Sequence, residues 1–140
     1  MLDSTVALAA WMLDHDTDSY YKISRAFLDG QPSGNLTRDQ IVDNVTLYWL
    51  TGTGASAARA YWESGRATAL AAGQAPPAVS VPVGFTTFPG EIFRAPRSWV
   101  EQGYPTLTYF NEVDRGGHFA AWEEPGLFSS EVRAAFRSLR

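Results

Sequence analysis

Two residues able to support acid–base chemistry follow two apolar, strand-like runs of the sequence. His118 lies in the glycine-containing segment 114–119, and Glu91 lies at the end of the preceding apolar run. A carboxylate that accepts a hydrogen bond from one imidazole nitrogen fixes the tautomer, so that the other nitrogen can take a proton from water or from a nucleophile. The pair therefore indicates two thirds of a nucleophile–acid–histidine triad.

The same residue types also have a purely structural interpretation. An acid and a histidine on loops are common, so His118 can equally be a surface-loop histidine and Glu91 an exposed carboxylate. Asp114, four residues before His118, competes with Glu91 as the partner of the imidazole. For a nucleophile, Ser56 in a glycine- and alanine-rich stretch comes nearest to a serine elbow, but it follows a predicted helix and lacks the last glycine of that motif.

The elements that must position these side chains alternate between strand and helix. The pattern predicts a strand over 78–88, a helix over 96–102, a strand over 107–113 and a last helix that begins at Pro125. Crossovers of such a βαβα unit make the two strands parallel, so the loops that follow them emerge at one edge of the sheet. Glu91 and His118 occupy those two loops. Pro82 inside the first strand departs from the pattern and is tolerated near a strand start.

The first half of the chain is predicted to be helical. Asp3 or Ser4 can cap a helix over 6–13, and a short helix over 20–28 follows the polar stretch 14–19. Thr37 and Gln40 fit a capping box before apolar residues that recur at helical spacing. Gly52 and Gly54 interrupt that helix, an alanine-rich helix spans 55–70, and 71–77 is a loop.

Composition narrows the class of protein. The 140 residues are 45% apolar and carry a net charge of −4, which argues against nucleic acid or an anionic membrane as a partner. The chain has no cysteine, so disulfides and thiolate chemistry are excluded, and we expect no cofactor and no metal. His15 lies among aspartates without ligand-like spacing and is interpreted as part of a solvated face. With no apolar run of membrane-spanning length, we expect a cytoplasmic protein.

Several motifs together resemble one family. In the second half they are the stretches 88–91, 96–99 and 114–125, and in the first half they are Asp3-Ser4, 8–11 and 44–53. These stretches resemble the C-terminal part of the microsomal-type epoxide hydrolases of the α/β-hydrolase fold, over nearly the whole chain. Thr5 stands where that family usually has proline. The resemblance implies an α/β fold in which 1–77 is a helical cap segment and 78–140 is the C-terminal part of the core.

The resemblance also implies a two-step hydrolysis of a small-molecule epoxide. An aspartate opens the epoxide to form an ester while cap tyrosines assist the ring oxygen, and a water activated by the histidine then releases a diol. The family pattern places the histidine at His118, the acid at Glu91 and one tyrosine donor at Tyr61, for which helix packing is the alternative role.

The nucleophile elbow, the oxyanion-hole segment and the other tyrosine of that family precede the cap and have no counterpart here. We therefore expect a truncated or split enzyme that is inactive alone, with a complementary chain or self-association as its partner. The alternatives are a related dehalogenase or esterase fragment and a non-catalytic interaction module; the residue at the missing elbow would distinguish them.

Overall fold

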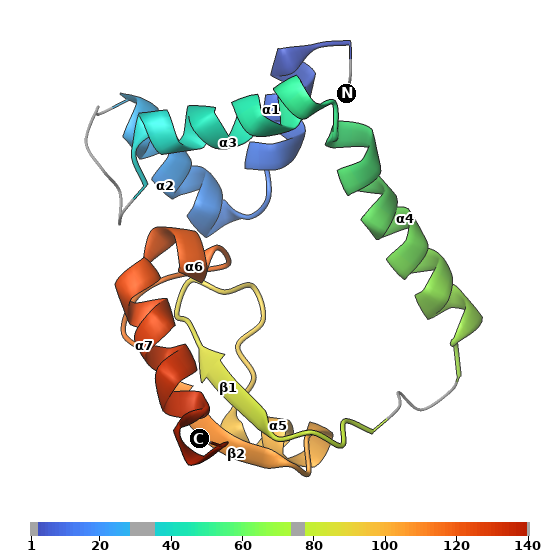
Figure 1. Ribbon diagram of the computed structural model, residues 1–140, viewed down its shortest axis with the longest axis vertical. Helices are drawn as coiled ribbons and strands as arrows, with labels where there is room; N and C mark the ends of the chain where they lie inside the picture. Colours follow the sequence, from blue (N-terminus) through green and yellow to red (C-terminus); the bar gives the residue numbers. More distant parts are fainter. Residues whose placement is uncertain (1–2, 29–35, 74–77, 140) are drawn as a thin grey trace.

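A computed structural model describes residues 3–28, 36–73 and 78–139 of the chain. Its first half consists of the helices α1 (Thr5–Leu13), α2 (Thr17–Leu28), α3 (Arg38–Thr51) and α4 (Gly54–Leu70). Helices α1, α2 and α3 pack together, whereas α4 runs apart from them toward the second half of the chain (Figure 1).

Local capping sets the helix boundaries. The Ser4 hydroxyl accepts a hydrogen bond from the Ala7 amide, and Thr37 and Gln40 form the predicted capping box. Gly52 ends α3 in the left-handed conformation with φ of 65°, which suits glycine. Helix α2 begins at Thr17 and not at the predicted residue 20, because Asp16 accepts from the Ser19 amide at 3.0 Å and caps an earlier start.

A small apolar core lies between α2, α3 and the segment that leads into α3. Ile23, Ala26, Leu36 and Ile41 are buried together there, and Trp122 from the second half of the chain packs against them. The N-terminal end of α4 is held by α1, because Gly54 lies so close to Leu8 that a Cβ atom at Gly54 would be 2.9 Å from Leu8 Cδ1. The core therefore joins the helical half to the second half through Trp122.

The second half of the chain is an α/β unit. Strand β1 (Val83–Thr87), helix α5 (Arg97–Gly103), strand β2 (Leu107–Glu112), helices α6 (Ala120–Glu123) and α7 (Pro125–Ala135) and a final 3₁₀ turn (Arg137–Leu139) follow one another. The two strands pair in parallel, as predicted, so the loops that follow them leave at the same edge. Pro125 occupies the first turn of α7, also as predicted.

Helix α7 is fixed to the sheet by one carboxylate. Glu131 accepts hydrogen bonds from the Tyr109 hydroxyl at 2.9 Å, the Thr86 hydroxyl at 3.0 Å and the Asn111 amide. Burial and the bond to Glu131 together raise the pKa of Tyr109. Gly84 allows the helix to approach, since a Cβ atom there would lie 2.6 Å from Ala135 Cβ.

One predicted strand boundary and one unpredicted helix distinguish the structure of the second half from the expectation. Strand β1 is shorter than 78–88: residues 78–82 precede the ladder, and Pro82, which has no amide hydrogen, directly precedes Val83. Helix α6 was not predicted, because four residues are too few to show a helical period. Part of the predicted loop 71–77 lies outside the described residues.

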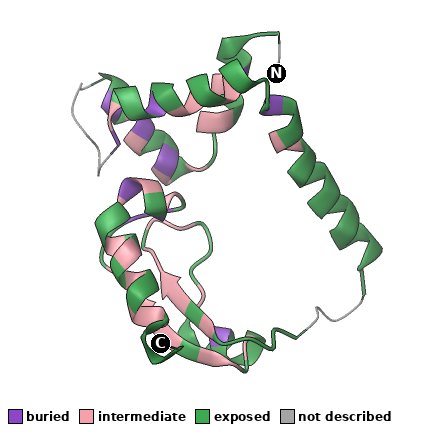
Figure 2. Cartoon of the chain, in the orientation of Figure 1, coloured by how far each residue is buried: buried purple, intermediate pink, exposed green. Residues whose placement is uncertain are grey.

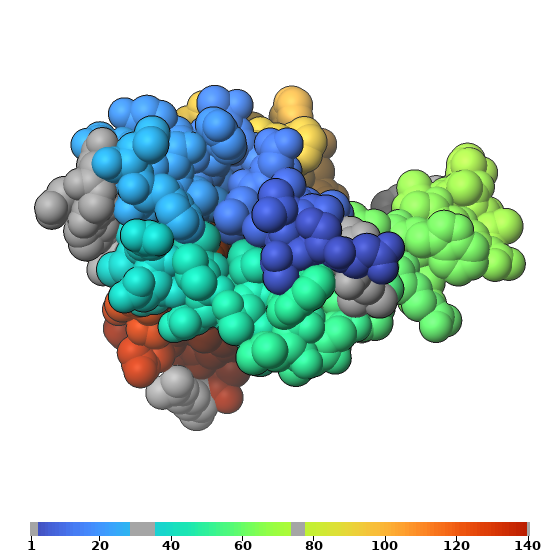
Figure 3. Space-filling view, turned by 90° about the horizontal axis from the view of Figure 1, so that it is seen from above, coloured from blue at the N-terminus to red at the C-terminus, as the bar shows by residue number. Residues whose placement is uncertain are grey.

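Much of the helical half is exposed, above all α4. Tyr61, Trp62 and Leu70 on α4 all present large side chains to solvent, and Figure 2 shows the helix exposed along most of its length. Seen from above, the C-terminal end of α4 projects beyond the rest of the molecule (Figure 3). Within the described ranges, none of the helices combines the length and the apolar character needed to cross a membrane.

Candidate active site

The two loops after the strands are tied together by their backbones. Gly90 and Gly117 form an isolated parallel bridge, and the Gly90 amide donates to the Gly116 carbonyl at 3.0 Å. Gly116 has φ of 94°, a conformation that side-chain-bearing residues rarely adopt. Gly90 and Gly117 also leave room for α2, because a Cβ atom on either would lie within 2.6 Å of Asp18 Oδ2. The loops thereby bring the side chains of Glu91 and His118 together.

His118 Nδ1 lies 2.9 Å from Glu91 Oε1. Because an ionised carboxylate only accepts hydrogen bonds, Nδ1 carries the proton and leaves Nε2 of the neutral ring as an acceptor. Burial raises the pKa of Glu91, but the hydrogen bonds from His118 and from the Ile92 amide outweigh it and lower the pKa. Glu91 is thus held as the charged partner of an imidazole whose side chain is 34% exposed.

Asp114 does not bind the imidazole in this structure. Its side chain is 81% exposed, and its carboxylate accepts from the Arg115 guanidinium at 3.0 Å. Of the two carboxylates considered from the sequence, Glu91 is therefore the one that contacts His118.

An open pocket of about 610 Å³ lies between the two halves of the chain. His118, Phe119 and Trp122 line it from the second half, and Trp11 and Tyr61 line it from α1 and α4. Tyr61 contacts Trp11 edge to face, with ring centroids 5.9 Å apart. The pocket wall also includes Tyr48. The structure therefore places His118 and Tyr61 on one largely aromatic pocket.

A second imidazole, from His15, reaches the same place. His15 stacks on His118 with ring centroids 3.9 Å apart and an angle of 23° between the ring planes, and it also lines the pocket. Its Nδ1 lies 2.9 Å from Asp16 Oδ2. Burial opposes ionisation of Asp16, but hydrogen bonds from Ser19 and His15 lower its pKa to about 2.

His15 was assigned to a solvated face, so this arrangement was not expected from the sequence. The contact with His118 joins residues far apart in the chain, so no local spacing reveals it. The expectation that His15 binds no metal stays a prediction; among the described residues, no group of three or more His, Cys, Asp or Glu side chains is arranged to hold an ion.

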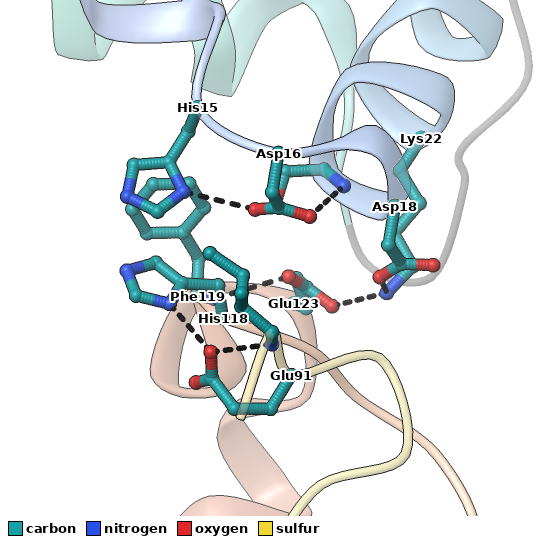
Figure 4. A network of polar contacts seen from close by, with 10 residues as sticks. His15, Asp16, Asp18, Lys22, Glu91, His118, Phe119 and Glu123 are labelled. Carbon is teal, nitrogen blue, oxygen red and sulfur yellow. Dashed lines mark hydrogen bonds and ion pairs between the residues drawn. The ribbon is translucent and has the colours of Figure 1, made fainter. Parts of the chain in front are cut away.

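Helix α2 is anchored to the loop that carries His118. The Lys22 ammonium contacts Glu123 Oε2 and lies 2.6 Å from Asp18 Oδ2 (Figure 4). Glu123 also accepts from the Phe119 amide at 3.2 Å, and its side chain is 1% exposed. Burial lowers the pKa of Lys22, but the two carboxylates outweigh it and raise the pKa. A buried ion pair therefore connects the helical half to the residue next to His118.

No nucleophile elbow is present in the described part of the chain. Residues 88–96 separate β1 from α5, and residues 113–119 separate β2 from α6, so neither strand turns directly into a helix. Ser56 lies within α4, where its hydroxyl donates to the Thr53 carbonyl at 2.9 Å. Its position on a helix rules out the elbow geometry.

The sequence is similar to several epoxide hydrolases. It is 44% identical over 142 residues to the "Putative epoxide hydrolase" of Stigmatella aurantiaca, a match that covers 100% of this chain and 29% of the relative. Epoxide hydrolase 1 of Sus scrofa is 37% identical over 131 residues, which cover 94% of this chain and 29% of the relative. No family model matches the sequence. The chain thus spans less than a third of the length of these relatives.

The fold has a counterpart among solved structures. The crystal structure of juvenile hormone epoxide hydrolase from the silkworm Bombyx mori matches 98% of this chain and 37% of that chain, with a TM-score of 0.65 and 24% identity. This likeness concerns the fold alone and confirms the predicted α/β-hydrolase class. By these sequence similarities, the chain resembles a C-terminal portion of epoxide hydrolases.

Proposed function

We propose that this chain supplies the histidine, the orienting acid and one tyrosine of an epoxide hydrolase that converts a small-molecule epoxide into a vicinal diol. The observation that carries the proposal is the contact of His118 with Glu91 at the edge of a pocket that Tyr61 also lines. Residues 1–77 then act as the helical cap and 78–140 as the end of the catalytic core. We further propose that the protein acts in the cytoplasm.

In this mechanism the nucleophile comes from the portion of an epoxide hydrolase that this chain does not match. That portion is supplied either in cis or by a complementary chain. An aspartate there attacks an epoxide carbon, and the ring C–O bond breaks to leave an alkoxide that Tyr61 protonates or hydrogen-bonds. His118 then takes a proton from water, and the water oxygen attacks the ester. Glu91 stabilises the imidazolium that forms, by the same hydrogen bond that fixed the neutral tautomer.

The test uses a chimera in which this chain replaces the matching portion of Sus scrofa epoxide hydrolase 1, with the native pig enzyme as the reference for turnover. In single-turnover kinetics, His118→Gln and Glu91→Gln should slow ester hydrolysis more than ester formation, whereas Tyr61→Phe should slow ring opening. The expected loss is on the order of 10²-fold, by analogy with removal of one oxyanion donor.

Asp114→Asn is the matched control for Glu91→Gln, because it removes a carboxylate from the neighbouring exposed loop and should change neither step. If Asp114→Asn abolished ester hydrolysis while Glu91→Gln had no effect, the assignment of the acid would be wrong. The chain alone should form no diol, and His118-dependent diol formation by the isolated chain would contradict the need for a second part.

A further inference from the structure

The two histidines of the chain each form an imidazole–carboxylate pair, and the two pairs lie side by side. His118 Nδ1 contacts Glu91, and His15 Nδ1 contacts Asp16, each at 2.9 Å. The rings are stacked, and Phe119 packs edge-on against both, with centroid distances of 5.2 Å to His15 and 5.0 Å to His118. The His15–Asp16 pair is therefore a second imidazole–carboxylate pair, stacked on the His118–Glu91 pair.

The free ring nitrogens of the two pairs point the same way. Each carboxylate accepts from Nδ1, so Nε2 of each neutral ring is left as an acceptor. Figure 4 shows these two nitrogens on the same side of the stack, opposite the carboxylates. Since His15 and His118 both line the pocket, two neighbouring acceptors become available to one small molecule there.

We propose that His15 is a second catalytic imidazole, which holds the hydrolytic water jointly with His118. The rings stack with centroids 3.9 Å apart and 23° between their planes, and Figure 4 draws both Nε2 atoms on the same edge of the stack. A water at that edge can donate one hydrogen to each ring nitrogen. Both hydrogens are then bound, and a lone pair points away from the rings.

This inference rests on the proposed function, because it concerns the ester-hydrolysis step. As the water oxygen bonds to the ester carbonyl carbon, the carbonyl π bond opens to an oxyanion, and the water O–H bond that faces His118 breaks as its proton moves to His118 Nε2. The ester C–O bond then breaks, and the departing alkoxide takes the proton back from His118. His15 keeps its own proton throughout and holds the second hydrogen of the water, which restricts the direction of attack.

The alternative role for His15 is packing alone, as an aromatic ring that supports His118. His15→Phe separates the two roles, because phenylalanine preserves a flat ring against His118 and Phe119 but has no acceptor nitrogen. His15→Gln is the complementary variant, since its amide oxygen can accept near the original Nε2 position without providing a ring. A packing role predicts that Phe is tolerated and Gln is not, and the proposal predicts the reverse.

The first measurement uses the 140-residue chain itself and does not depend on turnover. Nitrogen-15 NMR of the imidazoles at neutral pH should show both histidines protonated on Nδ1 and unprotonated on Nε2. A His15 that carries its proton on Nε2 would overturn the proposal, because that nitrogen could not accept from water.

The second measurement is single-turnover kinetics of the chimera. His15→Phe should slow ester hydrolysis roughly tenfold or more, by loss of water positioning, and leave ester formation unchanged. His15→Gln should recover part of that loss. If the His15→Phe variant hydrolysed the ester at the wild-type rate, the inference would be refuted and the proposed function would stand. If even the wild-type chimera forms no ester, the proposed function fails and the inference about its hydrolysis step fails with it.

Discussion

Replacement of Lys22 by methionine should destabilise the chain strongly, although Lys22 does not touch the imidazole of His118. The side chain of Glu123 is 1% exposed and that of Lys22 is 19% exposed, so their contact lies in the interior. Methionine fills the space of the lysine stem but removes the ammonium that Glu123 and Asp18 share. Removing one partner of a buried ion pair costs about 3 to 5 kcal/mol, and here it withdraws an ammonium from a carboxylate that is 1% exposed.

The charge state of Lys22 favours this result at neutral pH. The carboxylates raise the pKa of Lys22 above its ordinary value of 10.5, so its stabilising contribution is complete below that pH and is lost only as the pH rises through the folded-state pKa. Urea unfolding at pH 7, followed by circular dichroism, measures the loss. Small domains are stable by only about 5 to 15 kcal/mol, so the variant should unfold at a much lower urea concentration.

Two further variants make this prediction specific. Arg59→Met removes an exposed pair with Glu63 on α4 and should cost at most about 0.5 kcal/mol. Lys22→Met combined with Glu123→Gln should recover more than half of the loss, because glutamine is neutral and still accepts from the Phe119 amide. If Lys22→Met lost no more stability than Arg59→Met, the pair would not be buried as described and the reasoning would be refuted.

Three other predictions concern a loop, an acid and a sheet edge. Gly117→Ala should destabilise the chain by about 1 to 3 kcal/mol, because its Cβ would lie 2.6 Å from Asp18 Oδ2. The control Gly65→Ala lies in open space on α4 and should stabilise the chain by about 0.5 to 1 kcal/mol. Equal urea midpoints for the two variants would contradict this prediction. The pKa of Asp16 is lowered to about 2, so Asp16 contributes stability above pH 4 that is lost as the pH falls toward 2. Asp16→Asn should therefore weaken the pH dependence of the free energy of unfolding between pH 4 and 2. The exposed control Asp43→Asn should leave that dependence unchanged. Strand β1 pairs only with β2 among the described residues, so the chain should self-associate in sedimentation experiments, and a stable monomer at all concentrations would argue against a free edge.

The features predicted correctly from the sequence are those with local causes. The capping box of Thr37 and Gln40, the glycine end of α3 at Gly52 and the start of α7 at Pro125 each depend on a few neighbouring residues. The parallel pairing of β1 and β2 followed from the alternation of strand and helix, since a helical crossover leaves the strands pointing the same way. The same topology brings the loops of Glu91 and His118 to one edge, whereas the catalytic roles of those residues stay predictions.

The features that the sequence did not reveal depend on contacts between distant segments. Lys22 and Glu123 are 101 residues apart, and neither position shows its partner by spacing or composition. His15 was assigned to a solvated face because charged neighbours usually indicate one, yet the fold stacks its ring on the ring of His118. The start of α2 at Thr17 was not predicted for a local reason. Asp16 caps the helix, but it stands among several aspartates, so the sequence does not show which of them is the cap.

These distant contacts share one element, the turn into α2. His15 and Asp16 form the second imidazole pair, Asp18 lies against the two bridged glycines, and Lys22 holds Glu123. The segment 15–22, which leads into α2 and forms its start, therefore contacts both loops that carry the His118–Glu91 pair. Because a packed interior transmits small displacements, a shift of α2 would move the imidazole and its acid together. The helical half of the chain thus both lines the pocket and contacts the two loops that carry the acid–base pair.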